Sequence, residues 1–192
     1  MKKTAIGPKS YLYPMPVVLV GANVGGTPNY MTLAYCGIAQ MRPPMILCTL
    51  GRIHHTNKGI KENGTFSVNI PSAGMVVPVD YCGLVSGEKV DKSAVFTTFY
   101  GALKTAPMVE ECPVNIECRL RDILDYEGTN ELFLGDIVEV HVADACLDIK
   151  GMPDVKKIDP LLFSQPDNNY WRLGELLAPA WRVGREMVSK EE

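Results

Sequence analysis

Short apolar runs separated by glycine, proline and asparagine fill the first part of the chain. Residues 16–22 form a continuous apolar run rich in β-branched side chains, and a segment rich in glycine and asparagine, residues 23–29, follows it. This order predicts a buried strand and then a loop. Three further segments have the length and composition of strands, and they are residues 31–39, 45–50 and 65–70.

Two longer strand candidates lie in the second half of the chain. Residues 114–126 and 132–147 flank a turn-rich segment at residues 127–130. Their lengths predict a hairpin that curves around a barrel. Residues 159–174 contain aromatic side chains and proline but show no periodicity, so we expect irregular structure there.

Two segments have the character of short helices. Residues 56–63 are mostly polar and stop before Gly64, and glycine commonly ends a helix. Residues 74–85 are apolar without strict alternation, and the polar loop 86–92 follows them. With fourteen prolines and seventeen glycines scattered along the chain, these patterns predict a mainly β protein with a few short helices.

The composition is typical of a globular protein with one core. The 192 residues are 46% hydrophobic and 21% charged, which predicts a single domain over residues 1–192. A formal charge of −3 without a basic cluster argues against a nucleic-acid partner. The apolar runs are far shorter than the ~20 residues of a membrane helix, and Pro8, Pro14 and Pro16 interrupt any export signal. We therefore expect a soluble, cytoplasmic protein without a membrane partner.

The spacing of cysteine and histidine gives no support for a metal site. The six cysteines are dispersed without a C-x-x-C pair, which predicts small reduced core residues and no disulfide framework. His54, His55 and His141 have no partner at the spacing of metal ligands. Neither G-x-G-x-x-G nor G-x-x-x-x-G-K-[ST] occurs, so a Rossmann or P-loop nucleotide site is not supported.

A candidate anion site lies where the strand ending at residues 50–52 is followed by the helix that starts at Thr56. A helix N-terminus offers free amide groups and a partial positive charge. A phosphate therefore fits here, with Thr56 at the N-cap and Arg52 nearby. The alternative is that Thr56 only caps its helix and that Arg52 is solvated.

A series of short motifs extends over nearly the whole chain. In order they are PVVLV at 16–20, NYMTLA at 29–34, PP at 43–44, Thr56, TFSVNIP at 65–71, YCGLVSG at 81–87, DK at 91–92, EC at 117–118, GDIV at 135–138 and YWRLG at 170–174. Each motif is loose alone. Together their order and spacing resemble the flavin-reductase-like family of FMN-binding split barrels, and its flavoredoxin branch in particular.

The resemblance implies a Greek-key split β-barrel, a homodimer and one non-covalent FMN in each protomer near the dimer interface. It places Arg52 and Thr56 at the phosphate and lets Lys92 reach the cofactor. The aromatic Phe163 could cover the flavin or the dimer seam, or could fill the core. The residues that would contact the flavin ring and the ribityl chain are Asn29, Met31, Thr32, Ala34, Tyr35 and Cys36.

Several functions remain open from the sequence. The resemblance favours a flavoredoxin-like, FMN-dependent oxidoreductase, in which the flavin carries the electrons. One alternative is an NAD(P)H:flavin reductase that uses flavin as a substrate. The others are a flavin-binding electron carrier that serves a redox partner protein without turnover of its own, and a plain structural domain.

Overall fold

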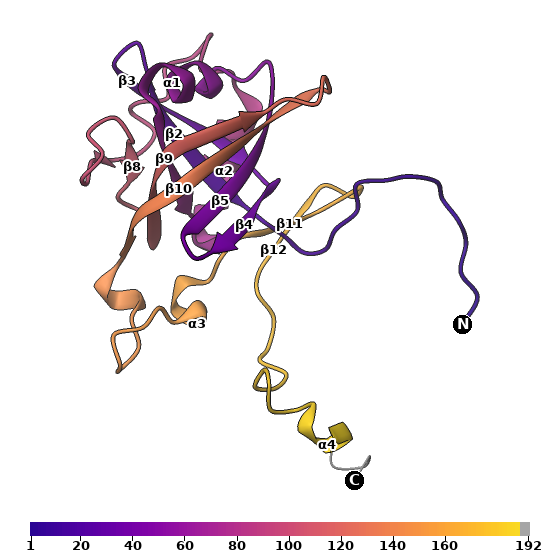
Figure 1. The fold of residues 1–192 in the computed structure, drawn as a ribbon. Coiled ribbons are helices and arrows are strands. Elements are labelled where there is room, and N and C mark those ends of the chain that lie inside the picture. Colours follow the sequence, from indigo (N-terminus) through magenta and orange to yellow (C-terminus); the bar gives the residue numbers. More distant parts are fainter. Residues whose placement is uncertain (189–192) are drawn as a thin grey trace.

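The computed structural model describes residues 1–188, which fold mainly into strands around one barrel (Figure 1). The strands are β1 (Met15–Pro16), β2 (Val18–Val24), β3 (Thr27–Leu33), β4 (Cys36–Met41), β5 (Pro44–Gly51), β6 (Thr65–Ile70), β7 (Thr98–Phe99), β8 (Met108–Val109), β9 (Val114–Leu124), β10 (Asn130–Val142), β11 (Leu162–Ser164) and β12 (Asn169–Trp171). The helices are α1 (Thr56–Asn63), α2 (Val76–Leu84), α3 (Val155–Ile158) and α4 (Arg185–Val188), and short 3₁₀ turns occupy Ala73–Met75 and Asp144–Cys146.

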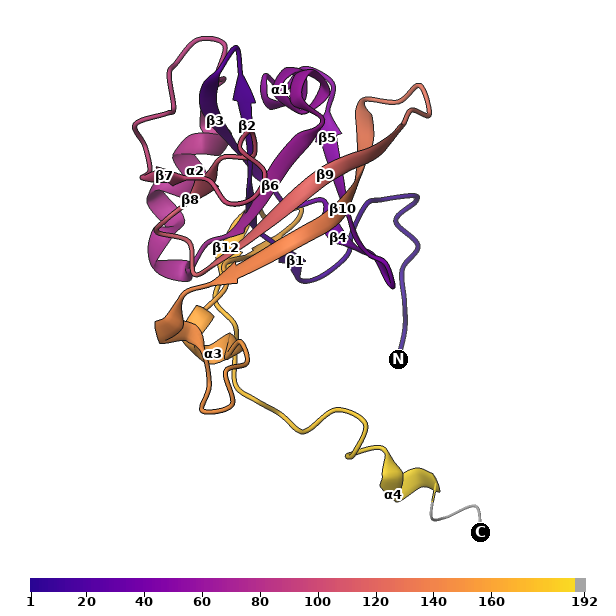
Figure 2. The ribbon, with the colours of Figure 1, turned by 60° about the vertical axis from the view of Figure 1, so that its left-hand side comes forward.

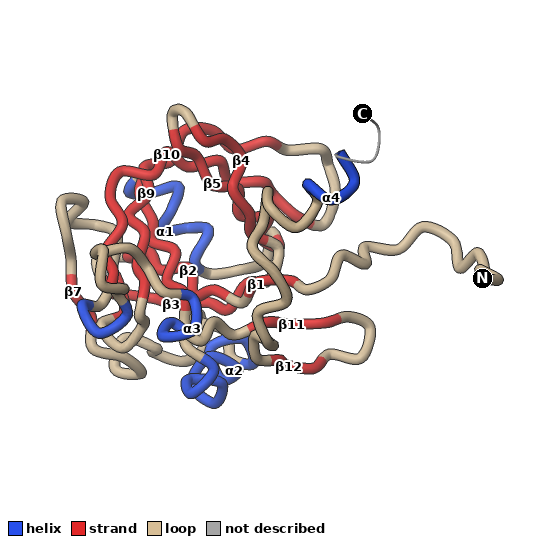
Figure 3. The backbone as a smooth tube through the Cα atoms, turned by 90° about the horizontal axis from the view of Figure 1, so that it is seen from below, coloured by secondary structure: helices blue, strands red, loops and turns tan. Residues whose placement is uncertain are grey.

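Seven strands form the main sheet, in the order β3-β2-β6-β9-β10-β5-β4. The two edge strands, β3 and β4, follow one another in sequence and are joined only by Ala34 and Tyr35. Such a short link between opposite edges requires the sheet to curl until its edges approach, which gives a barrel that is split between β3 and β4 (Figure 3). The predicted Greek-key split β-barrel is confirmed.

The β2–β3 hairpin shows why the first apolar run is continuous. Val18 and Val20 face the barrel core, whereas Leu19 faces a second core that lies beneath α2, so β2 is buried on both faces. The loop predicted at residues 23–29 is wrong. The two strands continue to a tight turn at Gly25 and Gly26, whose φ angles of 55° and 83° suit glycine.

The strand predicted at residues 31–39 is also wrong as a single element. It is broken at Ala34 and Tyr35, where the chain passes from β3 at one edge of the sheet to β4 at the other. An apolar run gives no sign of such a break, because both halves are strand-like in composition. This break creates the opening of the barrel.

Helix α1 has the predicted bounds, and Gly64 ends it with a φ of 65°. Gly59 allows the helix to contact β2 closely, since a Cβ at this position would lie 2.2 Å from the carbonyl oxygen of Asn23. The prediction that Thr56 is the N-cap is wrong. His55 holds that position without a side-chain cap, and Thr56 is the first helical residue.

The remaining predictions are confirmed in part (Figure 2). The helix predicted at residues 74–85 is a 3₁₀ turn followed by α2, and the long hairpin is β9–β10, although β10 already ends at Val142. The segment 159–174, predicted to be irregular, contains the β11–β12 hairpin, and β11 also pairs with β1. The first residues of the N-terminal arm (residues 1–14) and the C-terminal tail (residues 172–188) extend away from the barrel (Figure 1), whereas residues 9–14 of the arm return to it. Within residues 1–188 no helix is both long enough and apolar enough to cross a membrane.

Candidate functional site

Two neighbouring hollows lie on either side of the break between β3 and β4. The first, the Lys92 pocket, has a volume of about 230 Å³ and is lined by Met31, Thr32, residues 53–56, residues 82–87 and Lys92. The second, the Tyr35 cavity, has a volume of about 500 Å³ and is lined by residues 9–12, 14–16 and 34–39 with Leu47 and Thr49. Thr32 and Ala34 border the two hollows and are separated along an extended chain by roughly 7 Å.

The Lys92 pocket contains a buried cation. Lys92 is 3% exposed, and its Nζ donates to the carbonyl oxygens of Cys82 and Val85, each at 3.2 Å. Burial lowers the pKa of this ammonium group below its usual value. Within residues 1–188 no carboxylate forms an ion pair with Lys92. Because an ammonium group has three donors, Lys92 retains one for an anion.

Two histidines leave polar atoms unused in the same pocket. The Nδ1 atoms of His54 and His55 are buried and have no hydrogen-bond partner among the described residues. Burial lowers the pKa of His54, and the charge of Lys92 lowers it further. Buried polar atoms are nearly always paired in native proteins. With these unpaired nitrogens beside the ammonium group of Lys92, the pocket can accept an anion.

Thr56 at the start of α1 and Asn29 on β3 form a hydrogen-bonded pair. The Nδ2 atom of Asn29 donates to Oγ1 of Thr56 over 2.7 Å, and both side chains are buried. Thr56 is an acceptor in this bond, which leaves its hydroxyl proton for another partner. Gly87 allows the loop after α2 to contact Asn29, since a Cβ at Gly87 would lie 2.0 Å from Oδ1 of Asn29. Three segments distant in sequence are thereby held around one small space.

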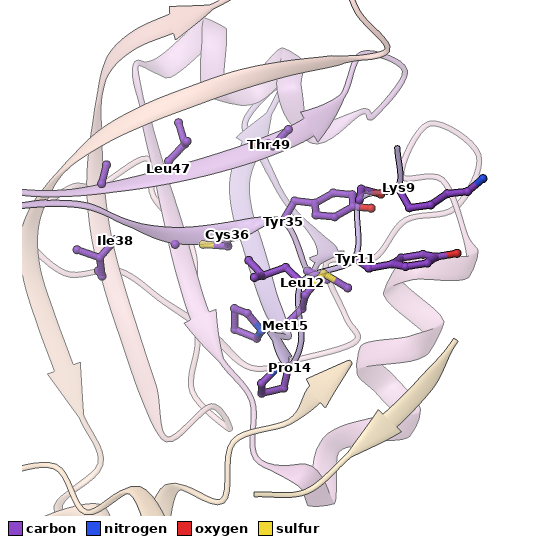
Figure 4. Close-up of a pocket in the computed structure, with 15 residues that line it drawn as sticks. Lys9, Tyr11, Leu12, Pro14, Met15, Tyr35, Cys36, Ile38, Leu47 and Thr49 are labelled. Atoms are coloured by element: carbon purple, nitrogen blue, oxygen red, sulfur yellow. The ribbon is translucent and has the colours of Figure 1, made fainter. Parts of the chain in front are cut away.

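The Tyr35 cavity has a different character, because it is mainly apolar and open on one side (Figure 4). Aromatic rings of Tyr11 and Tyr35 lie beside it, together with Leu12, Met15 and Cys36. The hydroxyl group of Tyr35 is fixed by the side-chain amide of Gln165, whose Nε2 donates to it over 2.8 Å. A cavity with these walls suits a flat aromatic group.

The structure brings most of the predicted site residues to these two hollows. Met31, Thr32, Thr56 and Lys92 line the Lys92 pocket, and Asn29 supports it through Thr56. The residues Ala34, Tyr35 and Cys36 line the Tyr35 cavity. His54 and His55 were missed as anion-site candidates, although they directly precede the predicted helix and so lie beside the predicted anion site. Within residues 1–188 no group of side chains could hold a metal ion.

Arg52 and Phe163 are not brought to either hollow. The guanidinium group of Arg52 is paired with Asp125, and its Nε donates to the carbonyl oxygen of Gly128 over 2.7 Å. Arg52 therefore holds the β9–β10 turn and does not face Thr56, contrary to the arrangement expected from the sequence. Phe163 packs against Tyr170, with ring centroids 5.8 Å apart, as part of the second core.

Known proteins resemble this chain both in sequence and in fold. Residues 10–167 match the family model described as flavin reductase like domain. The structure is similar to a flavoredoxin from Methanosarcina acetivorans, with a TM-score of 0.94, 48% identity and coverage of 97% of this chain and 100% of that chain. It is also similar to the flavoredoxin of Desulfovibrio vulgaris (Miyazaki F), with a TM-score of 0.88, 36% identity and coverage of 95% and 100%. In sequence the chain is 26% identical to an FMN reductase (NADH), RutF, of Agrobacterium fabrum over 118 residues, which are 61% of this chain and 65% of that protein.

Proposed function

This chain belongs to the flavin reductase-like family of redox flavoproteins, and from that premise we propose that it is an oxidoreductase with FMN as its flavin. The observation that carries the proposal is the Lys92 pocket, in which a buried cation and two orphaned histidine nitrogens surround the start of α1. A bound flavin supplies the electron chemistry, and the protein supplies position, charge and access.

The phosphate of FMN fits the Lys92 pocket for three physical reasons. A dianion compensates the buried ammonium group of Lys92, which has no acidic partner of its own among the described residues. It accepts hydrogen bonds from His54 and His55 when their Nδ1 atoms carry protons. It also lies at the uncapped start of α1, where the helix dipole is positive.

The flavin ring fits the Tyr35 cavity, which the short extended segment 32–34 connects to the Lys92 pocket. Tyr35 and Tyr11 offer aromatic surface to the ring, and backbone groups of residues 34–36 lie along the cavity wall. On this arrangement Asn29 holds Thr56 in place instead of contacting the ring. Arg52 is assigned to the β9–β10 turn, and its predicted phosphate contact passes to Lys92.

The flavin released from the protein by heat is expected to be FMN. The Lys92 pocket, at about 230 Å³, has room for one phosphate group, and the chain has no second nucleotide motif. Chromatography of the released flavin after reconstitution with an equal mixture of FMN, FAD and riboflavin measures this preference. Recovery of mainly FAD, or of FMN and riboflavin in equal amounts, would show that this pocket does not select a terminal phosphate.

A flavoredoxin-like oxidoreductase and an NAD(P)H:flavin reductase differ in their electron donor. We favour a flavoredoxin-like role because similarity to two flavoredoxins covers at least 95% of this chain, whereas similarity to the FMN reductase covers 61%. Anaerobic titration with NADH and NADPH, followed at the visible flavin absorption, distinguishes the roles. Bleaching by substoichiometric dithionite but by neither nicotinamide supports the flavoredoxin-like role, and rapid bleaching by one nicotinamide supports the reductase.

We further propose that the functional form is a homodimer. The N-terminal arm carries Ile6 and Leu12, which are 61% and 74% exposed, and the C-terminal tail carries Leu177 and Trp181, which are 96% and 94% exposed. Exposed apolar side chains on two extended arms need a partner surface, and a second copy provides one. Light scattering at micromolar concentration is expected to give twice the mass of 21.1 kDa. A monomer that retains its flavin would contradict the dimer.

A further inference from the structure

Two cysteine thiols face one another beside the Tyr35 cavity. Cys36 on β4 and Cys48 on β5 are direct partners in the antiparallel register, and their Sγ atoms are 3.5 Å apart. The cysteines of the described chain are free thiols. Sequence spacing gave no indication of this pair, because eleven residues and a strand reversal separate the two positions.

The backbone shows that this pair has the geometry for a covalent link. The amide of Thr49 donates to the carbonyl oxygen of Tyr35 over 2.9 Å. Tyr35 and Thr49 are therefore a hydrogen-bonded pair of the two strands, and Cys36 and Cys48 are the next pair along. These cysteines therefore form a non-hydrogen-bonded pair, in which facing Cα atoms are only about 4.5 Å apart. That separation lies inside the range of about 4.4 to 6.8 Å that disulfides span. Rotation of the two side chains, without movement of the strands, can bring the sulfurs to bonding distance.

The two thiols are not equivalent. Cys36 is half-buried and lines the Tyr35 cavity, so a small molecule in the cavity can reach its sulfur. Cys48 is fully buried, and the hydrogen bond with Cys36 and burial together raise the pKa of its thiol. Thiol–disulfide exchange needs an accessible attacking thiol and a second thiol to resolve the mixed disulfide. Cys36 suits the first role and Cys48 the second.

We propose that Cys36 and Cys48 form a redox-active dithiol that reduces low-molecular-weight disulfides. The Cys36 sulfur attacks one sulfur of the external disulfide, whose S–S bond breaks, and the first external thiol leaves with the proton of Cys36. Cys48 then attacks the Cys36 sulfur of the mixed disulfide, and the second external thiol leaves with the proton of Cys48. Two protein thiols are oxidised to one intrachain disulfide, and one external disulfide is reduced to two thiols.

The test treats the folded, full-length protein with hydroxyethyl disulfide and then counts its thiols. The wild type is expected to lose two of its six free thiols and the mass of two hydrogen atoms. Cleavage with cyanogen bromide after Met41 and Met45 separates the two cysteines in sequence. The intrachain disulfide is therefore expected to keep the fragment that ends at Met41 joined to the fragment that begins at Ile46, until a reductant is added.

Variants assign the two roles. Cys48→Ala is expected to accumulate the mixed disulfide at Cys36, and Cys36→Ala is expected to keep all its thiols. Cys146→Ser serves as the matched control, because the Cys146 thiol donates to the Lys157 carbonyl oxygen and does not line the cavity; it is expected to oxidise like the wild type. The proposal is overturned if the folded wild type keeps all six thiols, or if another pair of cysteines is joined. Flavin is removed from the protein before this treatment, because the proposed flavin ring would occupy the cavity that Cys36 lines, and the result is then independent of the proposed function.

Discussion

Replacement of Lys92 by methionine is expected to weaken FMN binding by roughly ten- to a hundredfold, since a charge-assisted hydrogen bond is worth about 1.5 to 3 kcal/mol. The ammonium group is buried and has no carboxylate partner within residues 1–188. No ion pair therefore competes with a phosphate for this group. Methionine fills a similar volume and removes only the charge and the donors. Fluorescence-quenching titration of flavin-free protein measures the dissociation constant.

Riboflavin is the internal control for this prediction. It lacks the phosphate, so wild type and Lys92→Met are expected to bind it with affinities that differ by less than about threefold. Loss of the bonds from Lys92 to Cys82 and Val85, at the end of α2, is expected to cost about 1 kcal/mol of stability. Lys104→Met, at an exposed lysine outside both hollows, separates this effect from a change in net charge. If Lys92→Met lost affinity for FMN and riboflavin equally, the phosphate would not bind at Lys92.

Arg52→Ala tests the assignment made from the sequence against the one made from the structure. If Arg52 held the phosphate, this variant would lose the preference for FMN over riboflavin. The guanidinium group is instead occupied by Asp125 and Gly128, so the preference is expected to remain.

The region of the proposed anion site could be predicted from the sequence, but the side chains that line it could not. A strand that ends near Arg52 and a helix that starts at Thr56 predicted a phosphate in the region where the structure has the Lys92 pocket, because helix starts are local features. Which cation faces that region depends on tertiary contacts. Arg52 is near in sequence yet points to the β9–β10 turn, whereas Lys92 arrives from a loop 36 positions after Thr56.

Strands were predicted best for β2 and β5, which are mostly apolar runs, and for β6, which alternates in part. The break at Ala34 and Tyr35 was missed, because an edge-to-edge crossing leaves no mark in hydrophobic periodicity. The pairing of Cys36 with Cys48 was missed for the same reason, since register is a property of the folded sheet. The short β7 and β11 strands pair over only two or three residues, which is too little for an alternation to register.

A buried carboxylate, Glu117 on β9, ties the loop before β8 to the barrel. Its Oε1 accepts from Nε2 of His141 over 2.6 Å and from the amide of Ala102 over 3.1 Å, and its Oε2 accepts from the amide of Leu103 over 2.6 Å. The side chain is fully buried. Gly101 is required beside it, because a Cβ there would lie 1.8 Å from Oε1 of Glu117. Burial would raise the pKa of Glu117, but the hydrogen bonds from His141, Leu103 and Ala102 outweigh it and hold the pKa below its usual value.

Replacement of Glu117 by glutamine is therefore expected to lower the free energy of unfolding by about 3 kcal/mol at neutral pH, since the amide group turns one acceptor into a donor that faces a backbone N–H group. Folding lowers the pKa of Glu117, so its ionised carboxylate stabilises the folded protein fully when the pH is above the unfolded pKa of about 4.5. This stabilisation is lost as the pH falls through the lower pKa of the folded protein. The difference between wild type and Glu117→Gln in urea unfolding should thus narrow below pH 4.5. Asp136→Asn removes a half-exposed carboxylate paired with Arg121 and is expected to cost less than about 1 kcal/mol. A difference for Glu117→Gln that stays constant with pH would show that the carboxylate charge contributes nothing to this contact.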